Sequence, residues 1–214
     1  MSKTRNALLH ALALVIVLVS ASPALAGPPL ICQPFDTGST RLLAWGSNPG
    51  TNWNAPDHSF DLKTLTSATL GALDADEAVL SRMENLRRAT IYAIQDPAAA
   101  HQLLSTLIGR ALSTTPTARA WFDAGYAIEA YKQAVHLRGP NGRFDRAAWA
   151  ATDETLRVDG YGFVKKAIAM SGANAEMEFA ASLMTQGAVA SVHRTRANAA
   201  AARGSFLAAN LAKY

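Results

Sequence analysis

The fold is decided by residues 116–135, PTARAWFDAGYAIEAYKQAV. Pro116, after Thr115, predicts a helix start, because proline is well accommodated in the first turn of a helix. At helical spacing, one stripe of this segment is apolar and consists of Trp121, Ala124, Ile128, Tyr131 and Val135. The opposite side adds Phe122 and Tyr126 among polar residues. A helix with apolar groups on two sides is typical of one that lies between neighbouring helices.

Helix signals continue on both sides of this segment. Asp96 and Pro97 repeat the start signal, since aspartate caps the first backbone N–H groups of a helix. Other helices are expected at about 61–70, 75–95, 145–157, 161–170 and 175–186, and an alanine-rich stretch reaches residue 214. No segment shows the sustained period-two alternation of a strand. We therefore predict an all-α protein.

Short connections predict that consecutive helices pair as antiparallel hairpins. The first helices of three such pairs would start near residues 75, 116 and 160, and these starts are 41 and 44 residues apart. Spacings of this size are typical of repeated helix pairs. The favoured architecture is a stack of hairpins that forms a short α-solenoid, and the alternative is a closed bundle of about six or seven helices.

The first 26 residues have the layout of a secretory signal peptide. Lys3 and Arg5 precede an apolar run over residues 7–19, and Ala24-Leu25-Ala26 is a small-residue cleavage site. The apolar run is shorter than the roughly 20 residues of a membrane-spanning helix. We expect an exported protein, periplasmic or secreted, without stable membrane insertion after cleavage.

Residues 27–60 differ in composition from the helical part, residues 61–214. They are rich in glycine, proline and small polar residues, which favour turns and extended backbone. The segment also carries four large aromatic residues, namely Phe35, Trp45, Trp53 and Phe60. We expect an irregular arm that docks its aromatic side chains onto the helical body. The alternative is that these side chains line a binding surface.

Cys32 is the only cysteine of the chain, so an intramolecular disulfide is excluded. Its neighbours Ile31, Pro34 and Phe35 favour a buried thiol, and the bulky Ile31 argues against a lipidation signal. Metal and haem sites that need two cysteines are also excluded.

Residues 127–134, AIEAYKQA, resemble the second helix of a tetratricopeptide repeat. The matching positions are Ala127, Tyr131 and Ala134, and Pro140 falls one residue beyond the closing proline of that family. The resemblance implies helical hairpins. In addition, Leu30-Ile31-Cys32 and Pro34-Phe35-Asp36 are similar to segments of uncharacterised exported bacterial proteins, which implies no activity.

Sequence motifs of known chemistry are absent. The chain has no nucleophile elbow, no phosphate-binding glycine loop and no histidine pair at zinc-binding spacing. We expect ordinary surface or capping roles for the four histidines after the leader, His58, His101, His136 and His193. No catalytic residue, cofactor or metal is assigned.

Two further groups of side chains have residue types that occur in metal or catalytic sites. Met170, Met177 and Met184 have the soft ligands of a copper site, but the break at Ser171-Gly172 separates Met170 from the other two. The neighbours Phe179 and Leu183 favour a place in the core for Met177 and Met184. Glu176 and Glu178 point in different directions on a helix, which argues against a carboxylate pair.

Charge argues against a nucleic-acid partner. The formal net charge is +4, and Lys3 and Arg5 of the leader account for part of it. Residues His193, Arg194, Arg196 and Arg203 make the last helices positive, and we expect a solvated polar face there.

The favoured function is a non-enzymatic interaction or scaffold module of the cell envelope, with a protein or peptide as its partner. The candidate interaction surface comprises Trp121, Tyr126, Tyr131 and Tyr161. One alternative is a small-ligand carrier whose pocket is lined by Trp121, Trp149 and the arm aromatics. The other is an enzyme with a carboxylate or histidine site that the sequence does not identify. The oligomeric state is left open.

Overall fold

In a computed structural model, the protein is described at residues 29–39, 41–46, 56–75, 78–134, 154 and 157–214. All regular structure in these residues is helical, which confirms the all-α prediction. A short 3-10 helix, η1 (Leu62–Thr64), is followed by α2 (Leu65–Ala75), α3 (Val79–Ala93), α4 (Pro97–Ala111), α5 (Ala118–Ala134), α8 (Gly160–Ser171), α9 (Ala175–Met184), α10 (Gly187–Ala200) and α11 (Phe206–Lys213). Within the described part, no helix has the length and apolar character needed to cross a membrane.

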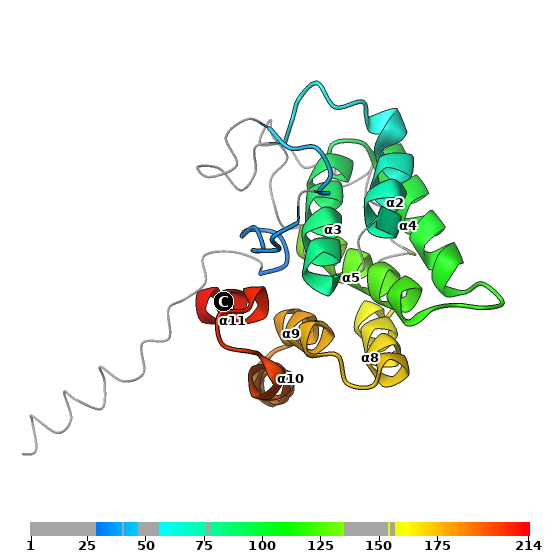
Figure 1. Cartoon of the computed structure of the whole chain (residues 1–214). Coiled ribbons are helices and arrows are strands. Elements are labelled where there is room, and N and C mark those ends of the chain that lie inside the picture. Colours follow the sequence, from blue (N-terminus) through cyan, green and yellow to red (C-terminus); the bar gives the residue numbers. More distant parts are fainter. Residues whose placement is uncertain (1–28, 40, 47–55, 76–77, 135–153, 155–156) are drawn as a thin grey trace, which may run out of the picture.

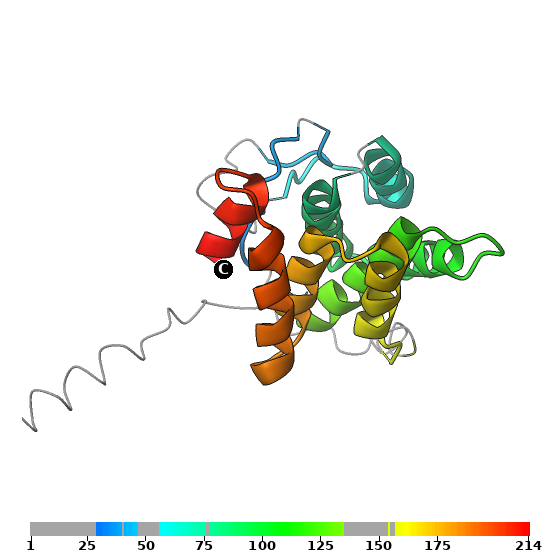
Figure 2. The ribbon, with the colours of Figure 1, turned by 60° about the horizontal axis from the view of Figure 1, so that its bottom comes forward.

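Helix α5 is the centre of the molecule, as its two apolar sides predicted. It contacts α3 and α4 on one side and α8 and α9 on the other. Figures 1 and 2 show it between the group α2–α4 and the group α8–α11. Consecutive helices also pack as neighbours, for example α2 on α3 and α9 on α10, which is consistent with a stack of hairpins.

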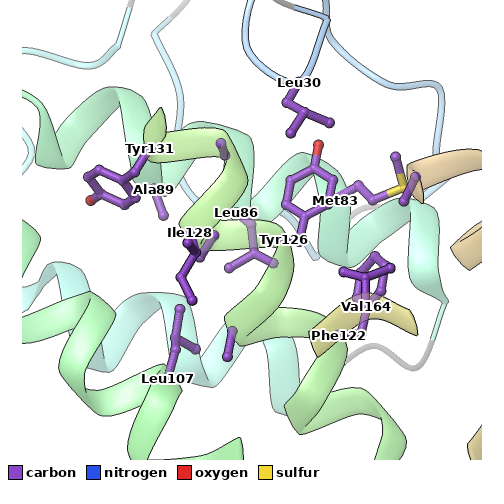
Figure 3. Packing of buried hydrophobic residues seen from close by; sticks show 14 of the residues in the cluster. Leu30, Met83, Leu86, Ala89, Leu107, Phe122, Tyr126, Ile128, Tyr131 and Val164 are labelled. Atoms are coloured by element: carbon purple, nitrogen blue, oxygen red, sulfur yellow. The ribbon is translucent and has the colours of Figure 1, made fainter. Parts of the chain in front are cut away.

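The core is built around the side chains of α5. Phe122, Tyr126, Ile128 and Tyr131 are all fully buried. Figure 3 shows Tyr126 pointing towards Leu30 of the arm, while Ile128 lies towards Leu107 of α4. Burial of each such side chain contributes roughly 1.5–3 kcal/mol to folding, so this helix supplies much of the hydrophobic stabilisation.

Helices α5 and α8 approach so closely that their backbones touch at two glycines. A Cβ atom on Gly125 would lie 2.5 Å from the carbonyl oxygen of Gly160 and 2.9 Å from the Cβ of Phe163. A Cβ on Gly160 would meet the carbonyl oxygen of Gly125 at 2.7 Å. Both positions therefore require glycine, and the pair fixes where α8 crosses α5.

Several helix ends agree with the sequence signals. The Asp96 carboxylate accepts hydrogen bonds from the backbone N–H groups of Ala98 and Ala99, with Pro97 in the first turn. Asp159 caps α8 in the same way, and Gly172 ends it with a positive φ of 69°. These caps confirm the predicted break points at 96–97, 159–160 and 171–172.

Other boundaries were wrong. Gly71 was expected to end a helix, but it lies inside α2, where a Cβ atom would meet nothing within 4 Å. Helix α5 begins two residues after Pro116, and Thr117 caps it by accepting from the N–H of Ala120. The alanine-rich end, for which no boundaries were predicted, forms two helices, α10 and α11, and Gly204 lies between them. Most of the helix expected at 145–157 lies outside the described residues.

The arm docks onto the body through buried side chains and through its backbone. Phe35, Leu30 and Ile31 are buried, which confirms the docking expected of Phe35. The rings of Trp45 and Phe60 contact Tyr92, with centroids 5.6 and 4.4 Å apart. Trp53 lies outside the described residues.

The arm backbone is held by polar side chains of α3. Glu84 accepts from the N–H of Phe35 at 3.1 Å, and Arg88 donates to the carbonyl oxygen of Leu43 at 2.7 Å. Arg87 donates to the carbonyl oxygen of Ile31. These bonds satisfy backbone groups that an irregular segment would otherwise leave unpaired when buried.

Cys32, which is part of the docked arm, is buried as expected. Burial raises the pKa of its thiol, although the nearby Arg87 charge acts in the opposite direction. The thiol is therefore protonated at neutral pH and unreactive.

Candidate functional site

A half-open pocket of about 380 Å³ lies between α8 and α10, with α9 as its floor. We call it the α8–α10 groove and define it by the residues that line it: Tyr161, Lys165, Ile168, Ala169, Glu178, Val189, Val192, His193 and Arg196. Its volume is within the range of ordinary ligand pockets. Figure 2 shows these three helices next to one another.

The two walls of the groove follow from helical spacing. Tyr161, Lys165 and Ile168 recur at intervals of four and three residues on α8, so they share one face. On α10, Val189, Val192, His193 and Arg196 share a face in the same way. Gly187 begins α10 with a φ of 60°, which allows the chain to turn and run back along α9.

A chain of hydrogen bonds crosses the groove and links its three helices. The hydroxyl oxygen of Tyr161 lies 2.7 Å from Nε2 of His193. The other ring nitrogen of His193, Nδ1, is hydrogen-bonded to Oε2 of Glu178. Nη1 of Arg196 lies 3.4 Å from Oε1 of the same carboxylate. One tyrosine, one histidine and one carboxylate are therefore connected in a row.

Burial differs along this chain. The side chains of Glu178 and His193 are almost fully buried, whereas that of Arg196 is largely exposed. Lys165 lies over the ring of Tyr161, with Nζ 4.8 Å from the ring centroid. The groove thus has a buried acid–histidine pair below and two basic side chains at its rim.

The Tyr161 hydroxyl remains protonated at neutral pH. Burial raises the pKa of Tyr161, and the negative charge of Glu178 raises it further. A phenol in this state donates one hydrogen bond and accepts others, but it is a poor nucleophile. The arrangement is therefore better suited to holding a ligand than to attacking one.

The prediction for His193 was wrong. It was expected at the surface or at a helix end, but its ring is buried against Glu178 and Tyr161. Glu178 was dismissed because Glu176 points elsewhere, and the structure pairs it with α10 instead. His58 and His101 are exposed as expected, and His136 lies outside the described residues.

The basic face expected on the last helices is only partly present. His193 turns inward, and Arg194 donates to the carbonyl oxygen of Leu211 at 2.6 Å. Arg196 and Arg203 are exposed. The apolar partners Val189 and Val192 at the same helical face were the sequence signal that α10 has a groove-facing side.

The four residues of the predicted interaction surface do not come together as an exposed face. Tyr126 and Tyr131 have 0% exposure, because α5 is covered on both sides. Trp121 is also buried and packs against Phe163, with ring centroids 4.6 Å apart. Only Tyr161 borders the groove. Trp149, which was considered for a ligand pocket, lies outside the described residues.

Metal ligands are not gathered in the described part of the chain. There, no group of three or more His, Cys, Asp or Glu side chains could hold an ion. Met177 is buried in the core and Met184 is partly buried against it, as expected. Met170, which was not expected to share their face, is exposed.

Comparison of the chain with protein-family models, with curated proteins and with solved structures gave no match. The candidate site therefore rests on its own geometry.

Proposed function

We propose that this protein is an exported helical interaction module and that it binds a partner polypeptide in the α8–α10 groove. Two exposed valines support this most strongly. Val189 and Val192 are 47% and 49% exposed and lie next to a pocket that contains oriented polar groups. Apolar surface beside a few fixed polar side chains is the usual composition of a binding site.

The other exposed apolar side chains lack this setting. Leu112, Met170 and Phe206 are also exposed, but none of them lines the groove. Single exposed apolar residues are normal on protein surfaces and need no explanation. The groove differs because its valines adjoin Ile168, Lys165 and the buried His193–Glu178 pair.

Export is supported by the layout of residues 1–26, with its positive start, apolar run and Ala24-Leu25-Ala26 site. Amino-terminal sequencing of the protein recovered from the envelope or the medium tests this. We expect Gly27 as the first residue. Recovery of the chain with Met1 in place would reject the export proposal.

Paired substitutions test the groove. Val192→Asp places a charge in the groove, and the matched control Leu112→Asp places the same charge on an exposed apolar residue outside it. Both sites are exposed, so each variant should keep its stability within about 0.5 kcal/mol.

The readout is cross-linked affinity capture from envelope extract with the mature protein as bait. We expect the wild type and Leu112→Asp to recover the same partner and Val192→Asp to lose it. Equal recovery by all three proteins, or no partner with the wild type, would reject the groove as the interaction site.

A further inference from the structure

We infer that the α8–α10 groove binds the free carboxyl end of a peptide whose last residue is apolar, and that His193 takes up one proton when it does. This inference rests on the proposed function and specifies its partner.

The charges around the groove favour an anion. The titratable and charged groups that face His193 are Tyr161 and Lys165 on α8, Glu178 on α9 and Arg196 on α10. Glu178 is the only acid among them, and Arg196 lies 3.4 Å from it. The charges of Arg196 and Glu178 offset each other, so Lys165 leaves a net positive charge at the rim of the groove, which attracts a carboxylate.

The hydrogen bonds at His193 decide what Tyr161 can offer to a ligand. An ionised carboxylate only accepts hydrogen bonds, so the bond between Glu178 and Nδ1 of His193 places a proton on Nδ1. If the ring is neutral, its Nε2 has no proton and must accept from the hydroxyl of Tyr161. The hydroxyl proton is then used, and the tyrosine offers only lone pairs, which repel an anion.

A protonated ring reverses this arrangement. Nε2 then carries a proton and donates to the oxygen of Tyr161, which leaves the hydroxyl proton free to donate to a ligand. A carboxylate accepts this bond. With a neutral ring, the carboxylate oxygen would instead face the lone pairs of the Tyr161 oxygen, and no hydrogen bond would form. When the ring is neutral before binding, a bound carboxylate therefore draws one proton from solvent onto His193, and release of the ligand returns it.

The apolar walls indicate where the carboxylate comes from. The terminal residue of a peptide carries its carboxylate and its side chain on one Cα atom, so both can enter a single pocket. Ile168, Val189 and Val192 line the same groove as Tyr161 and His193. The valines are half exposed, and they offer surface for the residues that precede the peptide end.

Calorimetry on the mature protein tests the ligand class. The probe is the peptide acetyl-Gly-Ala-Val-Val with a free carboxyl end, compared with its carboxyl-terminal amide and with free isovalerate. We expect the acid to bind at least about tenfold more tightly than the amide, which is a difference typical of one charge-assisted hydrogen bond. Equal binding of acid and amide overturns the inference. Isovalerate binding as tightly as the peptide overturns the assignment to a peptide end.

Proton uptake is measured in the same experiment. Titrations in two buffers with different ionisation heats, across about pH 5 to 8, report the number of protons exchanged. We expect proton uptake on binding of the acid, and where uptake reaches one proton the affinity should fall about tenfold per pH unit as the pH rises. No proton exchange at any pH overturns the coupling.

Variants separate this inference from the proposed function. His193→Gln should abolish proton uptake, and Lys165→Met should weaken the acid about tenfold while leaving the amide unchanged. Lys165 lies at the rim, so its variant also serves if His193→Gln does not fold. Leu112→Asp, outside the groove, should match the wild type. If Val192→Asp loses the captured partner while acid and amide bind alike, the groove function stands and the carboxylate inference fails.

Discussion

The carboxylates of Glu84 on α3 and Glu178 on α9 are almost equally buried, with exposures of 1% and 3%, but their surroundings differ. Glu84 is held by Arg87 at 2.8 Å and by Arg88 at 2.7 Å, and it also accepts from the arm backbone. Glu178 has a histidine and one distant, exposed arginine as its partners, and it borders a pocket.

This difference separates a structural cluster from a binding site. A buried ion is tolerated when charge and hydrogen bonds compensate its loss of water. The Glu84 cluster is compensated within the chain, and it fastens the arm. The buried charge of Glu178 is compensated less completely. The hydrogen-bonded row that it forms with His193 and Tyr161 also includes the Tyr161 hydroxyl, which borders the groove and can be reached by a ligand. Stability measurements can test this contrast directly.

The largest effect is expected at Glu84. Glu84→Gln removes the negative charge that Arg87 and Arg88 share. The buried guanidinium of Arg87 then loses its ion pair with Glu84. Breaking a buried pair from one side destabilises a protein by about 3–5 kcal/mol. Urea unfolding measures this, and a loss below about 1 kcal/mol would show that the cluster does not hold the arm.

The pH dependence of stability gives an independent check on Glu84. Burial opposes its charge, but the hydrogen bonds and charges of Arg87 and Arg88 outweigh burial and hold the pKa below the usual value of 4.5. Because the folded-state pKa is depressed, this stabilisation is present above pH 4.5 and is lost as the pH falls through the folded-state pKa. The wild type should therefore lose stability in that acidic range, and Glu84→Gln should lose less.

The second-largest loss of stability is expected at the contact between α5 and α8, the helix that forms one wall of the groove. Gly125→Ala places a methyl group against the backbone of Gly160, which should destabilise the protein by about 1–3 kcal/mol. Displacement of α8 should also weaken peptide binding in the groove. Gly71→Ala is the matched control, because a Cβ atom at this position of α2 meets only open space. This variant should gain about 0.5–1 kcal/mol in its free energy of unfolding. Equal effects at the two glycines would contradict the close helix crossing.

Substitution of Glu178 should lower the free energy of unfolding by less than substitution of Glu84. Glu178→Gln keeps an oxygen that can accept from Nδ1 of His193, so the loss should be about 1–2 kcal/mol. If its unfolding free energy falls as far as that of Glu84→Gln, the two networks do not differ as the geometry indicates.

The smallest change in stability is expected when the ion pair of Asp74 and Arg110 is broken. Their side chains are 59% and 37% exposed and lie 2.6 Å apart. Exposed pairs of this kind contribute about 0–1 kcal/mol, because water and salt screen them. Asp74→Asn should therefore shift the urea midpoint only slightly, and the shift should shrink with added salt.

The helical architecture could be predicted because its signals are local. Asp96 and Asp159 cap helices through atoms two or three residues away, and the two-sided apolarity of residues 118–134 revealed a central helix. Gly71 misled because an exposed helix tolerates glycine at a modest cost in free energy.

The candidate site could not be predicted because it is assembled from three helices. His193 is separated by 15 residues from Glu178 and by 32 residues from Tyr161. No spacing rule connects positions on different helices, so His193 was expected in an ordinary surface or capping role, and Tyr161 was assigned to an interaction surface without its true neighbours. Likewise, Tyr126 and Tyr131 carry polar hydroxyls, and only the packing around α5 shows that both are buried.

The arm has one further property, which concerns the order of folding. Tyr214 donates to the carbonyl oxygen of Gln33 at 2.6 Å and stacks on Phe35, with ring centroids 5.1 Å apart. Gln33 and Tyr214 are 181 positions apart in the chain. Contacts between such distant positions form slowly, because a long loop must close first. A ribosome or an export channel that releases the chain from its amino end must therefore release nearly all of it before Tyr214 can contact Gln33 and Phe35, whereas the arm contacts with α3 can form earlier. Because Cys32 adjoins Gln33, its alkylation rate during refolding reports when this end of the arm becomes buried.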